Sequence, residues 1–269
     1  MSKSPFAIHA LTKAIAAFGF IGLASPASAT LLLDYTGGTV LGSASVGPSD
    51  KDDGFATSGE SFDAPFFGES LSDPFPRISF NGHIYFGSGD GSGDYAPTAF
   101  GTSPIIRISP MWTDLSLGAA SQVIQNTGSG SSYNAVTWVN MQGGLGNEGF
   151  VATFQAIYFN AAATLNGISF NAGDIAFSYG DIENFNLPAD IMIGLDKGTG
   201  GFATLPGYET TEGWASHAGY GDLPVGADEY VHFRPDGGGY DVTIEPIPEP
   251  SAIAVALLGS LLLIARRRR

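Results

Sequence analysis

The chain has no cysteine, which excludes a disulfide framework, a thiolate metal site and a cysteine nucleophile. It also has few basic residues, with 11 Lys and Arg against 26 Asp and Glu. No basic patch can therefore displace the counterions of a phosphate backbone, so we expect no nucleic-acid partner. Convincing amphipathic helices are missing between residues 30 and 247, and this part of the chain must be built from strands.

Glycine is abundant, with 38 residues of 269, and 43% of the chain is hydrophobic. Together these features indicate short buried strands joined by many turns. Period-2 alternation recurs along the chain, as at Ile175, Phe177 and Tyr179, which should be buried while the two residues between them face outward. Many strands without intervening helices predict an all-β fold, an antiparallel β-sandwich.

The N-terminus has the pattern of an export signal. Two lysines precede an apolar stretch from Ala14 to Ala24, and Ala27 and Ala29 supply the small side chains that a signal peptidase accepts. We expect a signal helix within residues 1–29 and cleavage after Ala29. An ordinary amphipathic N-terminal helix is the alternative.

The C-terminus has a related pattern in reverse order. Pro248-Glu249-Pro250 precedes an uncharged apolar run, Ala252 to Ala265, and the chain then ends in four arginines, Arg266, Arg267, Arg268 and Arg269. As a helix rising about 1.5 Å per residue, the run spans only about 21 Å, less than the ~30 Å core of a bilayer. It should therefore be a transient stop, with the arginines cytoplasmic and the preceding chain across the membrane.

This tail resembles the PEP-CTERM sorting signal of Gram-negative bacteria over residues 248–269. The resemblance implies processing by a membrane exosortase near Pro248, Glu249 and Pro250. It also implies delivery through the inner membrane to the cell surface or to an exopolysaccharide matrix. A plain C-terminal membrane helix is the alternative, and whether processing anchors or releases the protein stays open.

Loss of both ends would make the chain strongly acidic. Residues 30–247 keep 5 of the basic residues and 25 of the acidic ones, a formal charge of −20. Such an excess of carboxylates has two explanations. One is solubility through self-repulsion of like charges, and the other is calcium binding. Two clusters are candidate calcium ligands, although neither has EF-hand spacing: Asp50, Asp52 and Asp53, and Asp90 and Asp94 in a Gly/Ser loop.

No local motif supports catalysis. The histidines between the two ends lie far apart in sequence, and no Gly-x-Ser-x-Gly elbow occurs. We therefore assign no catalytic residues, although two distant carboxylates could still form a glycosidase pair. Trp112 and Trp138 are each followed two residues later by a polar side chain, Asp114 and Asn140. We expect the tryptophans to pack in the core, the alternative being that each shares a face with its polar follower and covers a ligand.

The order of the strand segments resembles the nidogen-like (NIDO) extracellular domain over roughly residues 52–212. The blocks that carry the resemblance are Asn81 to Gly87, Pro104 to Ile106, Pro110 to Asp114, Tyr133 to Asn140, Phe150 to Gln155, Asp174 to Asp181, Ile193 to Asp196 and Leu205 to Gly207. This family is associated with extracellular matrix and cell adhesion, and it supplies no catalytic residues to transfer.

Five segments are therefore expected. They are the signal at 1–29, a first strand or leader at 30–51, a nidogen-like domain at 52–212, an extension at 213–247 that either completes the sandwich or forms a stalk, and the sorting tail at 248–269. The expected function is adhesion without catalysis, through binding to exopolysaccharide or a matrix protein. The alternatives are a calcium-assisted carbohydrate-binding module and a polysaccharide-processing enzyme.

Overall fold

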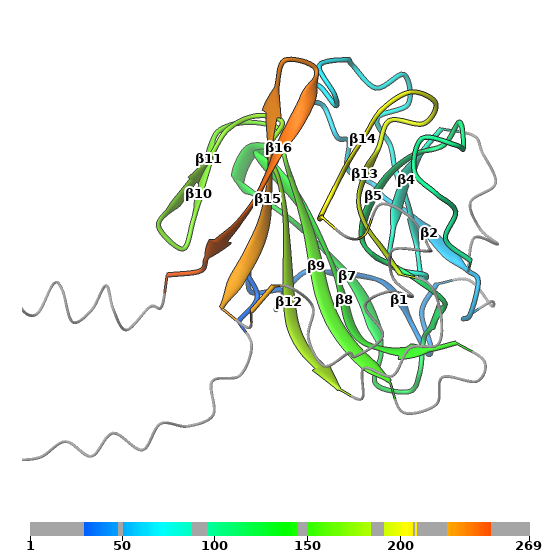
Figure 1. The fold of residues 1–269 in the computed structure, drawn as a ribbon. Helices are drawn as coiled ribbons and strands as arrows, with labels where there is room; N and C mark the ends of the chain where they lie inside the picture. The colour runs from blue at the N-terminus through cyan, green and yellow to red at the C-terminus, as the bar shows by residue number, and fades with distance from the viewer. Residues whose placement is uncertain are drawn as a thin grey trace, which may run out of the picture.

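A computed structural model describes residues 30–47, 51–87, 96–144, 150–183, 191–206, 208, 225–226 and 228–248. Within them nearly all of the regular secondary structure consists of antiparallel strands (Figure 1). The one helical element in these ranges is a 3₁₀ turn at Ser129–Ser131. The all-β sandwich predicted from period-2 alternation is confirmed. The helices expected in residues 1–29 and 252–265 lie outside the described residues, among which no helix is long and apolar enough to cross a bilayer.

The larger sheet has eight strands in the order β1-β7-β8-β9-β12-β15-β16, with β6 beside β8. Residues 30–51 supply an edge strand of this sheet, and the described part of 213–247 supplies its last two strands. The strands of this sheet are β1 (Thr39–Ser43), β6 (Leu115–Ser116), β7 (Gln122–Thr127), β8 (Tyr133–Gly143), β9 (Val151–Phe159), β12 (Ile175–Glu183), β15 (Glu229–Asp236) and β16 (Gly239–Pro246).

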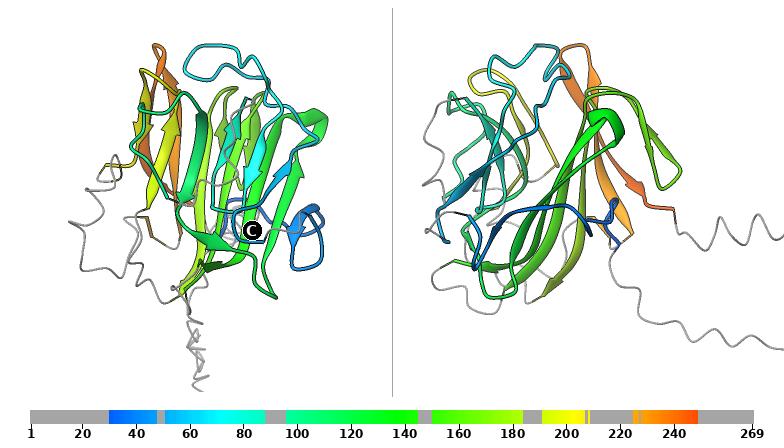
Figure 2. Two further views of the ribbon diagram at one scale, coloured as in Figure 1. Left: turned by 90° about the vertical axis from the view of Figure 1, so that its right-hand side faces the viewer. Right: turned by 180° about the vertical axis from the view of Figure 1, so that it is seen from behind.

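The smaller sheet has six strands in the order β14-β13-β5-β4-β3-β2, and it packs against the larger one as a second layer (Figure 2). Its strands are β2 (Phe55–Thr57), β3 (Arg77–Ser79), β4 (Ile84–Phe86), β5 (Ile106–Trp112), β13 (Met192–Asp196) and β14 (Phe202–Thr204). A separate hairpin of β10 (Ala163–Leu165) and β11 (Ile168–Phe170) projects from the outer side of the larger sheet (Figure 1).

The main core fills the space between the two sheets and is rich in aromatic side chains. Trp138 on β8 has no exposed surface, and its ring stacks on that of Phe154 with centroids 5.1 Å apart. Its indole N–H donates a hydrogen bond of 2.9 Å to the carbonyl of Ser79, which ties the larger sheet to β3 of the smaller one. The expected burial of Trp112 and Trp138 is confirmed.

A second apolar cluster lies on the outer face of the larger sheet, beneath the β10–β11 hairpin. Ala176 belongs to this cluster, whereas Ile175, Phe177 and Tyr179 belong to the main core, so the predicted alternation of faces is confirmed. Ala176 and Ser178 face outward from the main core as predicted, but they are buried rather than in contact with solvent. Their burial arises because residues remote in sequence cover this outer face, a feature that strand periodicity cannot reveal.

Candidate functional site

The first described residues lie across the outer face of the larger sheet and are fixed there by buried side chains. The backbone N–H of Leu32 donates to the hydroxyl of Ser178 at 3.1 Å, and that of Leu33 donates to the side-chain oxygen of Gln155 at 3.1 Å. The Gln155 amide nitrogen returns a hydrogen bond of 3.1 Å to the Leu33 carbonyl. The Leu32 side chain is only 1% exposed. Residues 30–35 are thus an integral part of the fold, anchored at both the backbone and the side chain.

The anchoring side chains form one polar row across three strands. Thr137 on β8 is the register partner of Gln155 on β9, which is also the register partner of Ser178 on β12. Gln155 donates to the Thr137 hydroxyl at 2.7 Å, so its buried amide is satisfied on both sides. This row needs the docked N-terminal segment, because without it the Gln155 oxygen would lose the Leu33 N–H.

Two β-bulges lie beside this row, one in β8 and one in β12, and both are opposite residues 152–154 of β9. The register between β8 and β9 shifts between Trp138 and Met141, and the register between β12 and β9 shifts between Tyr179 and Ile182. A bulge adds a residue to one strand and redirects the side chains there, and bulges are frequent beside functional sites. Here they turn Asn140 and Asp181 toward the outer surface on the two sides of Thr153.

These features line a groove of about 470 Å³ on the outer face of the larger sheet. Its floor comes from the bulged strands, one wall comes from the docked segment, and Asn166 comes from the β10–β11 turn. The lining residues are Thr30, Leu31, Leu33, Asp34, Tyr35, Asn140, Thr153, Asn166, Gly180 and Asp181. A side chain at Gly180 would place its Cβ 3.2 Å from Thr153 Cγ2, so glycine permits close approach of the two strands. A volume of this size falls within the range of small-ligand sites.

The lining is polar and acidic. Asp34 is exposed and accepts hydrogen bonds from the backbone N–H and the hydroxyl of Thr36, both at 2.9 Å. These two bonds, the backbone one first, lower the pKa of Asp34, so its carboxylate is ionised near neutral pH. The exposed carboxylate of Asp181, two amides, two hydroxyls and the half-buried ring of Tyr35 complete the set. Such groups can hydrogen-bond a polyhydroxylated ligand while the ring packs against its apolar face.

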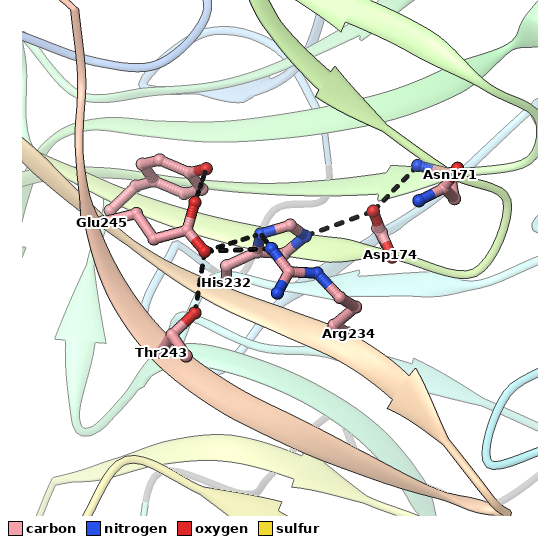
Figure 3. Close-up of polar contacts among 7 residues, drawn as sticks. Asn171, Asp174, His232, Arg234, Thr243 and Glu245 are labelled. Atoms are coloured by element: carbon pink, nitrogen blue, oxygen red, sulfur yellow. Dashed lines mark hydrogen bonds and ion pairs between the residues drawn. The ribbon is translucent and has the colours of Figure 1, made fainter.

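A second polar cluster surrounds His232 on β15, near the other end of the β10–β11 hairpin (Figure 3). One ring nitrogen, Nε2, lies 3.2 Å from a carboxylate oxygen of buried Asp174, and Nδ1 lies 3.0 Å from Arg234 and 3.4 Å from Glu245. Burial alone would raise the pKa of Glu245, but hydrogen bonds from Tyr230 and Thr243, together with neighbouring positive charge such as that of Arg234, lower it. The imidazole is 1% exposed and lies between Asp174 on one side and Arg234 and Glu245 on the other, so it links β15 with β16 and with the residue before β12.

A third polar group is buried on the far side of the smaller sheet. The Arg107 guanidinium lies 4.4 Å from the ring centroid of Trp112, in cation–π geometry, and the His83 ring lies 5.1 Å from the same indole. Burial and, second, the charge of Arg107 lower the pKa of His83 to about 3. Burial raises the pKa of Asp196, although its carboxylate accepts N–H bonds from Gly198 and Gly101. We assign this group to the packed interior, since all four side chains are at most 1% exposed.

The structure describes only two of the five candidate calcium ligands, Asp52 and Asp53. Asp50, Asp90 and Asp94 lie outside the described residues. Asp53 accepts a hydrogen bond of 3.2 Å from the side chain of Asn81. Burial and then the charges of Asp52 and Asp53 raise the pKa of Asp114, so these three carboxylates are neighbours. Even so, no group of three or more His, Asp or Glu side chains in the described ranges is arranged to hold a metal ion.

Most of the predicted processing residues also lie outside the described ranges. Pro248 is described and follows Ile247, which is 5% exposed and packs in the same outer cluster as Leu32. Residues near both boundaries of the domain thus meet on one face. The remaining residues of both signals lie outside the described ranges: Ala27, Ala29, Glu249, Pro250, Arg266, Arg267, Arg268 and Arg269.

Comparison with known proteins adds no relative. No protein-family model, curated protein or solved structure matches this chain. The resemblances to the PEP-CTERM signal and to the nidogen-like domain therefore stay predictions.

Sequence reasoning did not find the groove. Asp34 and Tyr35, Asn166, and Asp181 lie in three places along the chain, and no catalytic or ligand-binding motif includes them. Asn140 was identified as the polar follower of Trp138 and as the end of the block Tyr133 to Asn140, with a shared face for the two side chains as the alternative to a buried tryptophan. That alternative does not hold, because the bulge after Trp138 leaves the indole in the core and Asn140 exposed at the groove. Asn140 has a positive φ of 49°, a conformation that asparagine tolerates better than most residues, so the asparagine itself is the local sequence signal for the redirected side chain.

Proposed function

We propose that this chain is an exported surface or matrix protein that adheres by binding a glycan of the exopolysaccharide matrix, without turning it over. The observation that carries the proposal is the groove, in which hydroxyl, amide and carboxylate groups surround an aromatic ring on a sheet-based scaffold. The bulged strands and the N-terminal segment docked on them hold these groups in place, which lowers the ordering cost of binding. The nidogen-like resemblance and the acidic composition support an extracellular, adhesive role. Weak sites of this kind gain strength when many copies contact one polymer.

The two ends of the chain support export. The N-terminal pattern supplies a cleavage site for signal peptidase after Ala29, and the tail supplies a substrate for an exosortase. We expect protein recovered from outside the producing cell to begin at Thr30 and to lack Arg269, as measured by intact mass. Full-length protein confined to the cytosol would contradict this part of the proposal.

Binding should depend on the groove. Residues 30–247 contain all described strands and can be tested without the hydrophobic ends. We expect Tyr35→Ala to weaken binding to the exopolysaccharide of the producing organism by about 2–10-fold, because a lost aromatic contact is worth roughly 0.5–1.5 kcal/mol. Phe75→Ala is the matched control, since Phe75 is a 52% exposed aromatic outside the groove.

Calorimetry or a pull-down with immobilised polysaccharide would measure the effect. Equal loss in the two variants would place binding elsewhere. A polysaccharide whose chain length falls with time in contact with the protein would instead indicate an enzyme, contrary to the proposal.

A further inference from the structure

The charge of the groove restricts its ligand. Two carboxylates, those of Asp34 and Asp181, line it, and none of the lining residues that the structure describes is Lys, Arg or His. Asp34 is held ionised by its two hydrogen bonds from Thr36. Cleavage after Ala29 would add one ammonium group at Thr30, also a lining residue, which leaves the carboxylates in excess. A groove of this composition repels acidic sugars.

The surrounding protein strengthens this preference. Between residues 30 and 247 the chain has 5 basic and 25 acidic residues. The long-range field therefore attracts cations and disfavours the approach of polyanions such as uronic-acid polymers, at distances up to about the Debye length of ~8–10 Å.

We propose that the groove binds a glycan whose sugars carry free ammonium groups, an amino-sugar polymer. This inference rests on the proposed function and names the class of ligand for the same site. An ammonium group forms stronger hydrogen bonds with a carboxylate than a sugar hydroxyl does, and each bond fixes the position of one sugar. Asn140, at the bulge of β8, and Asn166, in the β10–β11 turn, supply donors and acceptors for the neutral hydroxyls. Recognition thus combines charge with a row of neutral contacts.

The test compares three soluble probes on residues 30–247: a glucosamine hexamer, cellohexaose and a polyuronate oligomer of equal length. We expect the glucosamine hexamer to bind at least about tenfold more tightly than cellohexaose at low salt, a difference equivalent to one 1.4 kcal/mol step, and the polyuronate not to bind. The preference should shrink as salt rises. The double variant Asp34→Asn, Asp181→Asn should abolish the preference, so that the glucosamine hexamer binds it no more tightly than cellohexaose does.

A charge-matched control separates a site from general attraction to an acidic protein. Asp236→Asn with Asp241→Asn removes the same charge from the exposed β15–β16 hairpin, whose turn lies at the top of Figure 1, away from the docked N-terminal segment. The control should keep the preference. An equal loss in the control and groove variants would overturn the inference. Equal binding of glucosamine and cellohexaose, reduced by Tyr35→Ala, would overturn the inference and leave the proposed function standing, whereas no glycan binding at all would overturn both.

Discussion

Trp138→Ala should lower the free energy of unfolding by about 3–5 kcal/mol, which is the typical effect of removing a fully buried large aromatic side chain. The indole has no exposed surface, stacks on Phe154 and donates a hydrogen bond to the Ser79 carbonyl of the opposite sheet. The substitution therefore removes packing and leaves a buried carbonyl without its donor. Urea unfolding of residues 30–247, followed by circular dichroism, would measure the loss.

Two further variants separate the causes. Trp138→Phe keeps an aromatic ring beside Phe154 but removes the N–H, so it should cost about 1–3 kcal/mol, the penalty for an unsatisfied buried polar group. Phe75→Ala, at a half-exposed aromatic, should change stability by no more than about 0.5 kcal/mol. A loss at Trp138→Ala as small as that of Phe75→Ala would show that the two sheets do not pack around this residue.

His83 should make the protein less stable as the pH falls below neutrality. Burial and the charge of Arg107 lower its pKa from the ordinary 6.5 to about 3 in the folded chain. The unfolded chain then takes up the proton first as acid is added, so this stabilisation is complete above about pH 6.5 and is lost as the pH falls toward 3. The loss should approach about 1.4 kcal/mol for each pH unit, since one pKa unit corresponds to 1.36 kcal/mol.

The variant His83→Leu isolates this effect from the titration of the many carboxylates. It has no ionisable group at this position, so the stability of the variant relative to the original chain should rise steadily between pH 6.5 and 4. Urea midpoints at several pH values provide the measurement. Parallel curves for the two proteins across this range would show that His83 is protonated in the folded state or is accessible to water.

The sandwich could be predicted from the sequence because strand periodicity is a local property. Side chains two residues apart share a face, so Ile175, Phe177 and Tyr179 could be assigned to one core from the sequence alone. The docking of the N-terminal segment was left open between strand and leader. It depends on Gln155 and Ser178, which are 122 and 146 residues from the backbone groups that they bind. No local sequence pattern at Leu32 or Leu33 indicates that their backbone groups bind residues so distant in the chain.

The groove could not be predicted for a related reason. A bulge shifts the faces of all residues that follow it, and its position is set by pairing with a neighbouring strand rather than by residue type. Asn140 and Asp181 reach one surface only because β8 and β12 both bulge against β9. Clusters of neighbouring aspartates are, by contrast, easy to find in a sequence. That pattern led to the calcium hypothesis for Asp50, Asp52 and Asp53, which stays a prediction because Asp50 lies outside the described residues.

Hydrogen exchange of residues 30–247, measured by mass spectrometry with and without the matrix glycan, tests the central claim most directly. The groove predicts slower exchange on binding in residues 31–35 and around the bulges that flank Thr153, with no change at the β15–β16 turn. A bound glycan that protects another surface, and leaves the N-terminal segment and both bulges unchanged, would contradict the assignment of this groove as the adhesive site.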